Sequence, residues 1–122
     1  MEVLADEKFL HDWVIRQIEQ KYSREFNEIS VNPGEEENFD YKGFFPDVIF
    51  GNYGQVVQLI EVETKSTANK DRIEYWKEIS DLGVQLIVLV PVEVQNELRD
   101  LFWENGLAAK VKIGTYSVSI KI

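Results

Sequence analysis

Residues 85–90, QLIVLV, are apolar after the first position and are followed by a proline. A short apolar run of this kind is typical of a strand that is buried on both faces of a sheet. It is preceded by a second strand-like segment at residues 56–64, and between the two segments Ile73, Trp76 and Ile79 recur at helical spacing. Strand, helix and strand in this order form a βαβ unit, whose strands are expected to be parallel. The fold class is therefore predicted to be α/β.

The other elements lie on either side of this unit. Helices are predicted over residues 5–22, 70–82 and 92–106, and strands over residues 24–31, 46–50, 56–64 and 85–90. Near the end of the chain, apolar and polar residues alternate on both sides of Gly114 and Thr115, which predicts a β-hairpin with a two-residue turn. The predicted order is helix, three strands, helix, strand, then a helix and a hairpin around one mixed sheet. Trp13, Trp76 and Trp103 each occupy an amphipathic helix and are expected in the core.

Length and composition set further bounds. A chain of 122 residues is long enough for one domain with a core, and no apolar run approaches the roughly 18 residues of a membrane span. The acidic amino terminus lacks the features of a signal peptide, and the absence of cysteine excludes disulfides and thiolate metal sites. We therefore expect residues 1–122 to form a single cytoplasmic domain that has no membrane partner.

Acidic side chains gather on one face of the strand predicted at residues 56–64. Because side chains alternate along a strand, Glu61, Glu63 and Lys65 should share one face, at spacings of about 6 to 7 Å. Burying these charges without partners would cost several kcal/mol, so they are expected to meet water, one another or a cation. The alternative is the solvated face of an edge strand with one ion pair.

Asp47 joins these acids only in one register of the hairpin that its strand forms with the next. A tight turn at residues 52–53 would place Asp47 opposite Gln58, whereas a looser or bulged turn would pair it with Glu61 or Glu63. The bulged register also gathers four apolar residues on the opposite face, namely Val48, Phe50, Ile60 and Val62. The apolar pattern therefore favours a site in which Asp47 meets the acids of the following strand.

Two or three carboxylates beside a lysine would form an oxygen-rich site. Such sites suit Mg²⁺ or Mn²⁺, which is commonly held by one or two protein carboxylates and completed by water and substrate phosphates. A metal bound there lowers the pKa of its water and stabilises negative charge on a phosphoryl oxygen. Lys65 would orient the attacking water and stabilise the developing charge.

Pro46 and Asp47, followed after a gap of fifteen residues by Glu63, Thr64 and Lys65, resemble the motif of the PD-(D/E)XK nuclease superfamily. This superfamily includes restriction endonucleases and archaeal Holliday-junction resolvases. The order of predicted elements is also similar to its core, over about residues 5–90. The resemblance implies a restriction-endonuclease-like three-layer fold, with residues 91–122 as a carboxy-terminal extension.

The resemblance also implies roles for individual residues. Asp47 and Glu63 would ligate a divalent metal, the carbonyl of Thr64 would add a ligand, and Lys65 would assist hydrolysis of a phosphodiester. Members of the superfamily often carry a further acid on the first helix, where Glu7 is the best match and Glu19 an alternative. Glu61 is an extra acid beside the motif and is expected to share the metal.

Two functions remain open at this point. One is a nuclease that depends on Mg²⁺ or Mn²⁺ and acts on DNA in preference to RNA, and the other is an inactive domain of the same fold that binds a protein. The net charge of −9 opposes nucleic-acid binding unless metal, a homodimer or a basic protein partner compensates. The basic residues expected near the rim of the site are Lys8, Arg16, Lys42, Lys65, Lys70 and Arg72. His11 could reach the site from the first helix, but it is expected to have an ordinary helix-surface or packing role, and Arg72 and Tyr75 either approach phosphates or form a solvated helix face.

Overall fold

The structure is a computed structural model in which residues 5–118 are described. Its α-helices are α1 (Ala5–Lys21), α2 (Ile73–Ser80) and α3 (Gln95–Glu104). Its strands are β1 (Glu28–Val31), β2 (Val48–Asn52), β3 (Gln55–Val62), β4 (Gln85–Pro91) and β5 (Val111–Tyr116). Short 3₁₀ turns at Lys70–Arg72 and Val92–Val94 lead into α2 and α3. Helices and strands therefore follow one another in the predicted order up to α3.

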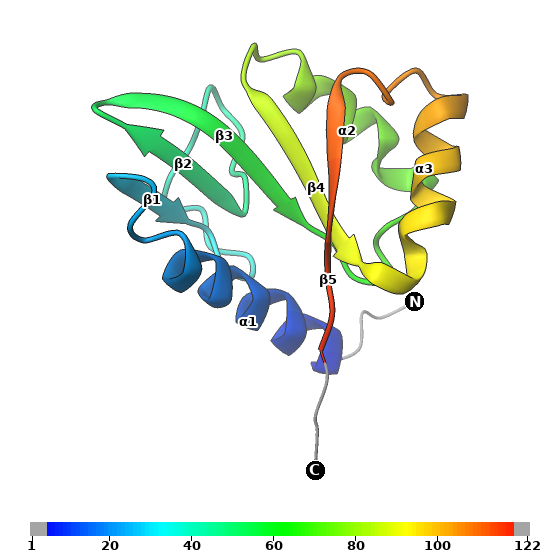
Figure 1. The fold of residues 1–122 in the computed structure, drawn as a ribbon, viewed down its shortest axis with the longest axis horizontal. Helices are drawn as coiled ribbons and strands as arrows, with labels where there is room; N and C mark the ends of the chain where they lie inside the picture. The colour runs from blue at the N-terminus through cyan, green and yellow to red at the C-terminus, as the bar shows by residue number, and fades with distance from the viewer. Residues whose placement is uncertain (1–4, 119–122) are drawn as a thin grey trace.

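The described strands form one mixed sheet in the order β1-β2-β3-β4-β5 (Figure 1). The pairs β1/β2 and β2/β3 are antiparallel, whereas β3/β4 and β4/β5 are parallel. The parallel pairing predicted for the βαβ unit is confirmed. Because β3 is the central strand, the alternative in which its acids form a solvated edge is wrong.

The sheet is covered on both faces, which gives three layers (Figure 1). On one face, α1 packs Val14, Ile15 and Ile18 against apolar side chains of β2 and β3. On the other face, α2 and α3 bury a larger cluster in which Trp76 and Phe102 meet edge to face, with ring centroids 5.5 Å apart. Acids on β3 that point toward α2 are therefore placed inside the protein.

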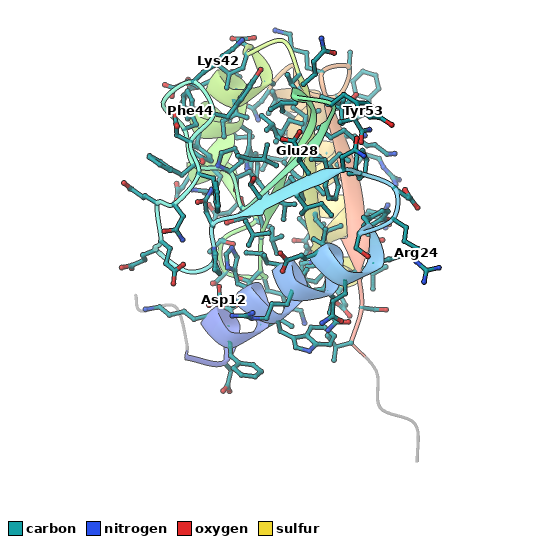
Figure 2. All side chains as sticks on the ribbon, turned by 90° about the vertical axis from the view of Figure 1, so that its left-hand side faces the viewer. Asp12, Arg24, Glu28, Lys42, Phe44 and Tyr53 are labelled. Carbon is teal, nitrogen blue, oxygen red and sulfur yellow. The ribbon has the colours of Figure 1, made fainter. Side chains whose placement is uncertain are left out.

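The loop between β1 and β2 is tied together by one buried side chain. Asn32 donates from Nδ2 to the carbonyls of Phe39 and Pro46, both at 2.7 Å, and its Oδ1 accepts the N–H of Asn38 and Phe39. In Figure 2, which looks onto the β1 side of the sheet, this loop carries the labelled Lys42 and Phe44. Its anchoring at Pro46 fixes the entry into β2.

The predicted carboxy-terminal hairpin is wrong where the structure describes it. Gly114 and Thr115 lie inside β5 and pair with Leu89 and Val90 of β4, so the chain does not turn there. A Cβ at Gly114 would lie 2.9 Å from Leu89 Cδ1, so the glycine leaves room for the side chain of Leu89 within the strand pair. Residues 119–122 of the expected second strand lie outside the described residues.

Two of the three tryptophans are not in the core. Trp76 is fully buried as expected, but Trp13 on α1 is 40% exposed and Trp103 on α3 is 72% exposed. Amphipathic spacing puts a side chain near the apolar stripe of its helix but does not fix how far the neighbouring layer covers it. Across residues 5–118, none of the helices has the length and apolar character needed to cross a membrane.

Candidate functional site

The register of β2 and β3 brings Asp47 beside the acids. Val48 pairs with Ile60, and the hairpin closes through a tight turn at Tyr53 and Gly54, both with positive φ. A bulge with Val57 as its extra residue lies between these two points and shifts the register by one. The predicted bulged register is confirmed, and Asp47, one residue before Val48, therefore lies beside Glu61.

Asp47 is held by two donors on one oxygen. Its Oδ2 accepts the backbone N–H of Val62 at 2.7 Å and lies 3.1 Å from Nε2 of His11. The other ring nitrogen of His11, Nδ1, is 3.0 Å from Oδ1 of Asp12, which also accepts the N–H of Gly34. His11 therefore bridges two carboxylates, and these hydrogen bonds and charges raise its pKa to about 9 despite the opposing effect of burial. The alternative in which His11 reaches the site from the first helix is therefore the correct one, and the expected surface or packing role is wrong.

We expect His11 to make folding stability depend on pH above neutrality. Its pKa is about 9 in the folded protein against 6.5 ordinarily, so its stabilisation is complete below pH 6.5 and is lost as pH rises through 9. This difference corresponds to about 3 kcal/mol. Urea unfolding of His11→Gln should show a deficit of that order at pH 6 that disappears near pH 10. A deficit of the same size at both pH values would contradict a protonated His11.

Glu61 is buried between Asp47 and the second helix. It is 2% exposed, and the hydroxyl of Tyr75 donates to its Oε1 at 2.5 Å. Burial raises the pKa of Glu61 well above its usual range, and the neighbouring Asp47 charge and hydrogen bond raise it further. Glu61 therefore stays protonated to a higher pH than an exposed glutamate does.

Glu63 lies deeper along the same face and is paired with a cation. Its Oε2 accepts from Nε and Nη2 of Arg72 and from Nε1 of Trp76, each at 3.1 Å. Burial raises the pKa of Glu63, and the charge of Arg72 opposes the rise. The carbonyl of Glu63 also accepts the hydroxyl of Tyr116, whose pKa burial raises to about 12.

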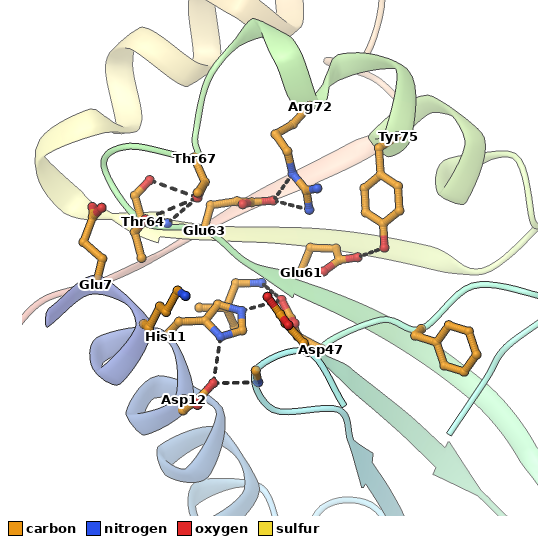
Figure 3. A pocket seen from close by; sticks show the side chains of 15 residues that line it. Glu7, His11, Asp12, Asp47, Glu61, Glu63, Thr64, Thr67, Arg72 and Tyr75 are labelled. Carbon is orange, nitrogen blue, oxygen red and sulfur yellow. Dashed lines mark hydrogen bonds and ion pairs between the residues drawn. The ribbon is translucent and has the colours of Figure 1, made fainter. Parts of the chain in front are cut away.

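These three carboxyl groups line one open cavity of about 660 Å³ (Figure 3). Each takes its protein donors on one oxygen: Oδ2 of Asp47, Oε1 of Glu61 and Oε2 of Glu63. The cations that line the cavity are Lys8, His11 and Arg72. A cavity lined by carboxyl groups and basic side chains can bind a metal cation through the carboxyl groups and an anionic group through the basic side chains.

Lys65 is not where the motif would place it. The face shared by Glu61 and Glu63 was expected to continue to Lys65, but β3 ends at Val62 and Lys65 is an exposed residue of the following turn. Lys65 does not line the cavity. The prediction that Lys65 shares a strand face with Glu61 and Glu63 is therefore wrong, because alternation of side chains stops where the strand stops.

Glu7 and Thr64 are two further residues that the resemblance assigns to the site. Glu7 lies at the rim, where its carboxylate accepts from the backbone N–H and the hydroxyl of Ser66, and this hydroxyl is the main reason that its pKa is lowered. The carbonyl of Thr64 accepts the N–H of Thr67 at 3.2 Å and of Ala68 at 3.0 Å, so it closes a turn. The alternative acid, Glu19, does not line the cavity. Glu7 and Thr64 both line the cavity, and their oxygens accept hydrogen bonds from residues 66–68 of the turn after β3.

Three functional side chains were given only minor or open roles by the sequence. His11 lies one helical turn after Glu7 and is the residue of the first helix that reaches Asp47. Arg72 immediately precedes α2, and Tyr75 and Trp76 lie in its first turn. These three side chains donate hydrogen bonds to Glu61 and Glu63. The sequence signal for these residues is the presence of polar and aromatic side chains at the start of the helix that follows the acidic strand.

The carboxyl pair Asp47 and Glu61 fits a divalent cation by its chemistry. Both groups offer hard oxygen ligands at a cavity, and Mg²⁺ needs only one or two protein carboxylates. Glu63 is drawn toward Arg72 and Trp76, and across residues 5–118 no three acidic or histidine side chains are arranged to hold a metal ion. A cation would therefore bind first at Asp47 and Glu61, where its charge would favour the ionised form of Glu61.

Comparisons of the chain with protein-family models, with curated proteins and with solved structures found no match. The resemblance to a nuclease superfamily therefore depends on the residues quoted from the sequence and on their positions in this fold. Asp47, Glu61 and Glu63 lie at the cavity, and Lys65 does not.

Proposed function

We propose that this protein is a divalent-metal-dependent phosphodiester hydrolase that acts on nucleic acid, with DNA preferred to RNA. One observation carries the proposal: the β-bulge places Asp47 beside the buried Glu61 at an open cavity. The order of helices and strands and the covered mixed sheet support a restriction-endonuclease-like fold for residues 5–90. Fold alone does not define activity, so the proposal depends on the site.

In this proposal Asp47 and Glu61 hold Mg²⁺ or Mn²⁺, and the surrounding residues orient them. His11 and the N–H of Val62 fix one oxygen of Asp47, and the hydroxyl of Tyr75 fixes one oxygen of Glu61. When bound, the metal would supply a water of lowered pKa and positive charge for a phosphoryl oxygen. Because the fold raises the pKa of Glu61 and a metal binds the ionised carboxylate, affinity for the metal should rise with pH.

Metal binding tests the proposal directly. Calorimetric titration with Mg²⁺ and with Mn²⁺ at pH 8 should detect binding by the wild type and not by Asp47→Asn. Lys65→Ala is the control and should bind like the wild type, because Lys65 is exposed outside the cavity. Binding that survives in Asp47→Asn, or no binding by the wild type, would overturn the assignment.

The substrate is then identified by hydrolysis. Supercoiled DNA, linear duplex DNA, single-stranded DNA and single-stranded RNA should be incubated with Mn²⁺ and the wild type or Asp47→Asn. Cleavage of DNA by the wild type alone is the expected result. Cleavage that is the same in both preparations would come from a contaminant.

A second candidate is a domain of the same fold that binds a protein without catalysis. It is favoured by the net charge of −9 and by the engagement of Glu63 with Arg72 and Trp76, which opposes metal binding at that residue. The acidic surface would suit a basic protein partner, and a second copy of the chain is the other possibility raised by the sequence. Failure of the wild type to bind metal would favour this candidate.

A further inference from the structure

Arg72 has unused hydrogen-bonding capacity beside the carboxyl groups. A guanidinium has five N–H donors, and Arg72 uses one on Nε and one on Nη2 for the same oxygen of Glu63. No other acceptor for Arg72 is found within the described chain, residues 5–118. Three donors therefore remain for a ligand in the cavity that Arg72 lines.

The position of Arg72 is fixed by its neighbours. Its guanidinium lies over the ring of Tyr75, 4.4 Å from the centroid, and its side chain is 36% exposed whereas that of Glu63 is 3% exposed. Tyr75 in turn donates to Glu61 (Figure 3). Arg72 thus presents a partly exposed, planar cation that contacts Glu63 directly and is linked to Glu61 through Tyr75.

The other cations of the cavity are less suited to this role. Both ring nitrogens of His11 are committed to Asp47 and Asp12, and Lys8 is an exposed residue of the first helix. Lys65, expected from the motif, does not line the cavity. An arginine matches phosphate better than a lysine because its donors form a planar fork that can bind two oxygens.

We propose that Arg72 binds the phosphodiester of the substrate and that, in doing so, it releases Glu63 toward the metal. This inference rests on the proposed function and assigns the anion-binding residue of the same site. Glu63 would keep the N–H of Trp76 on Oε2 when Arg72 leaves, so the buried carboxylate is not left without a donor. A phosphate that takes up the remaining donors of Arg72 competes with Glu63 for the guanidinium and weakens this ion pair, so phosphate and metal favour each other's binding, and such coupling is reciprocal.

The test measures binding of each ligand separately in the intact chain. Arg72→Gln and Arg72→Lys are compared with the wild type, and Arg99→Gln serves as the control because Arg99 lies on α3 outside the cavity. DNA binding is followed in EDTA by the anisotropy of a fluorescein-labelled oligonucleotide. Mn²⁺ binding is followed by calorimetry without DNA. Melting curves establish that each variant is folded.

The two affinities should change in opposite directions. In Arg72→Gln we expect DNA affinity to fall roughly ten- to a hundredfold, as for the loss of charge-assisted hydrogen bonds. The affinity for Mn²⁺ should rise roughly fivefold or more, because Glu63 is no longer held by a cation. Arg72→Lys should retain part of the charge and lose the fork, and so bind DNA with intermediate affinity.

Other outcomes separate the two proposals. If Arg72→Gln weakens both ligands equally, Arg72 only supports the fold of the site and the inference is wrong. If the wild type binds Mn²⁺ and DNA and Arg72→Gln binds both unchanged, the inference fails but the proposed function stands. If the wild type binds no Mn²⁺ with or without DNA, the proposed function fails, and the coupling fails with it.

Discussion

Glu61→Gln is expected to stabilise the free protein and to lower the proposed hydrolysis strongly. The pKa of Glu61 is raised in the fold, so stability falls as pH rises above the ordinary value of 4.5, and a neutral glutamine avoids this loss. Glutamine keeps an oxygen for the hydroxyl of Tyr75. The gain at pH 7.5 should be roughly 0.5 to 2 kcal/mol, which is the range seen when a strained functional group is replaced. The loss of a metal ligand should lower hydrolysis about a thousandfold, since several kcal/mol of transition-state stabilisation are removed.

A matched exposed glutamate provides the control. Glu74 on α2 is 84% exposed on its side chain and lies 3.8 Å from Lys77, so Glu74→Gln should change stability by less than about 0.5 kcal/mol. Urea unfolding at pH 5 and pH 7.5 should show that the advantage of Glu61→Gln grows with pH. A variant that is less stable than the wild type at pH 7.5 would mean that Glu61 is ionised and stabilising in the fold.

The sequence correctly predicts that Asp47 and Glu61 meet, and this prediction depends on the alternation of side chains between the two faces of a strand. Asp47 and Glu61 are brought together because their strands must bury Val48, Phe50, Ile60 and Val62 on the opposite face. A one-residue slip would expose that whole set, so the apolar pattern constrains the register even where the turn is ambiguous. The bulge at Val57 is the local adjustment that reconciles a tight turn with this register.

The part that fails lies just beyond the strand. Glu63 still donates its N–H to the carbonyl of Leu89, but the chain then turns, and the hydroxyl of Thr67 accepts the N–H of Thr64. Polar residues that cap turns, such as Ser66 and Thr67, marked this boundary in the sequence. The prediction continued the alternation of side chains past this boundary, and it therefore placed Lys65 on the face of a strand that had already ended at Val62.

The carboxy-terminal strand and the tryptophans show the limit of local patterns. Gly114 fits both a hairpin turn and a crowded strand, and only the packing of Leu89 against it distinguishes the two. Trp76 and Trp103 both occupy amphipathic helices, and the neighbouring layers decide that Trp76 is buried and Trp103 is exposed. His11 likewise gained its role from the approach of Asp47, which is 36 residues away in the chain.

Trp76→Ala is expected to have the largest effect on stability. Trp76 is fully buried, packs edge to face on Phe102 and donates Nε1–H to Glu63, so this substitution opens a cavity and removes a donor from a buried carboxylate. Truncating a buried tryptophan costs about 3 to 5 kcal/mol. Trp76→Phe keeps most of the ring contact and should lose about 1 to 3 kcal/mol, chiefly through the missing donor.

Trp103→Phe is the matched control, because Trp103 is 72% exposed and its substitution should change stability by less than about 0.5 kcal/mol. A double-mutant cycle with Glu63→Gln separates packing from the hydrogen bond in urea unfolding. If the bond matters, Trp76→Phe should cost less in the Glu63→Gln background, since a neutral side chain needs the donor less than a carboxylate does. An equal cost in both backgrounds would assign the whole effect to packing and leave Arg72 as the only side chain that holds Glu63 in place.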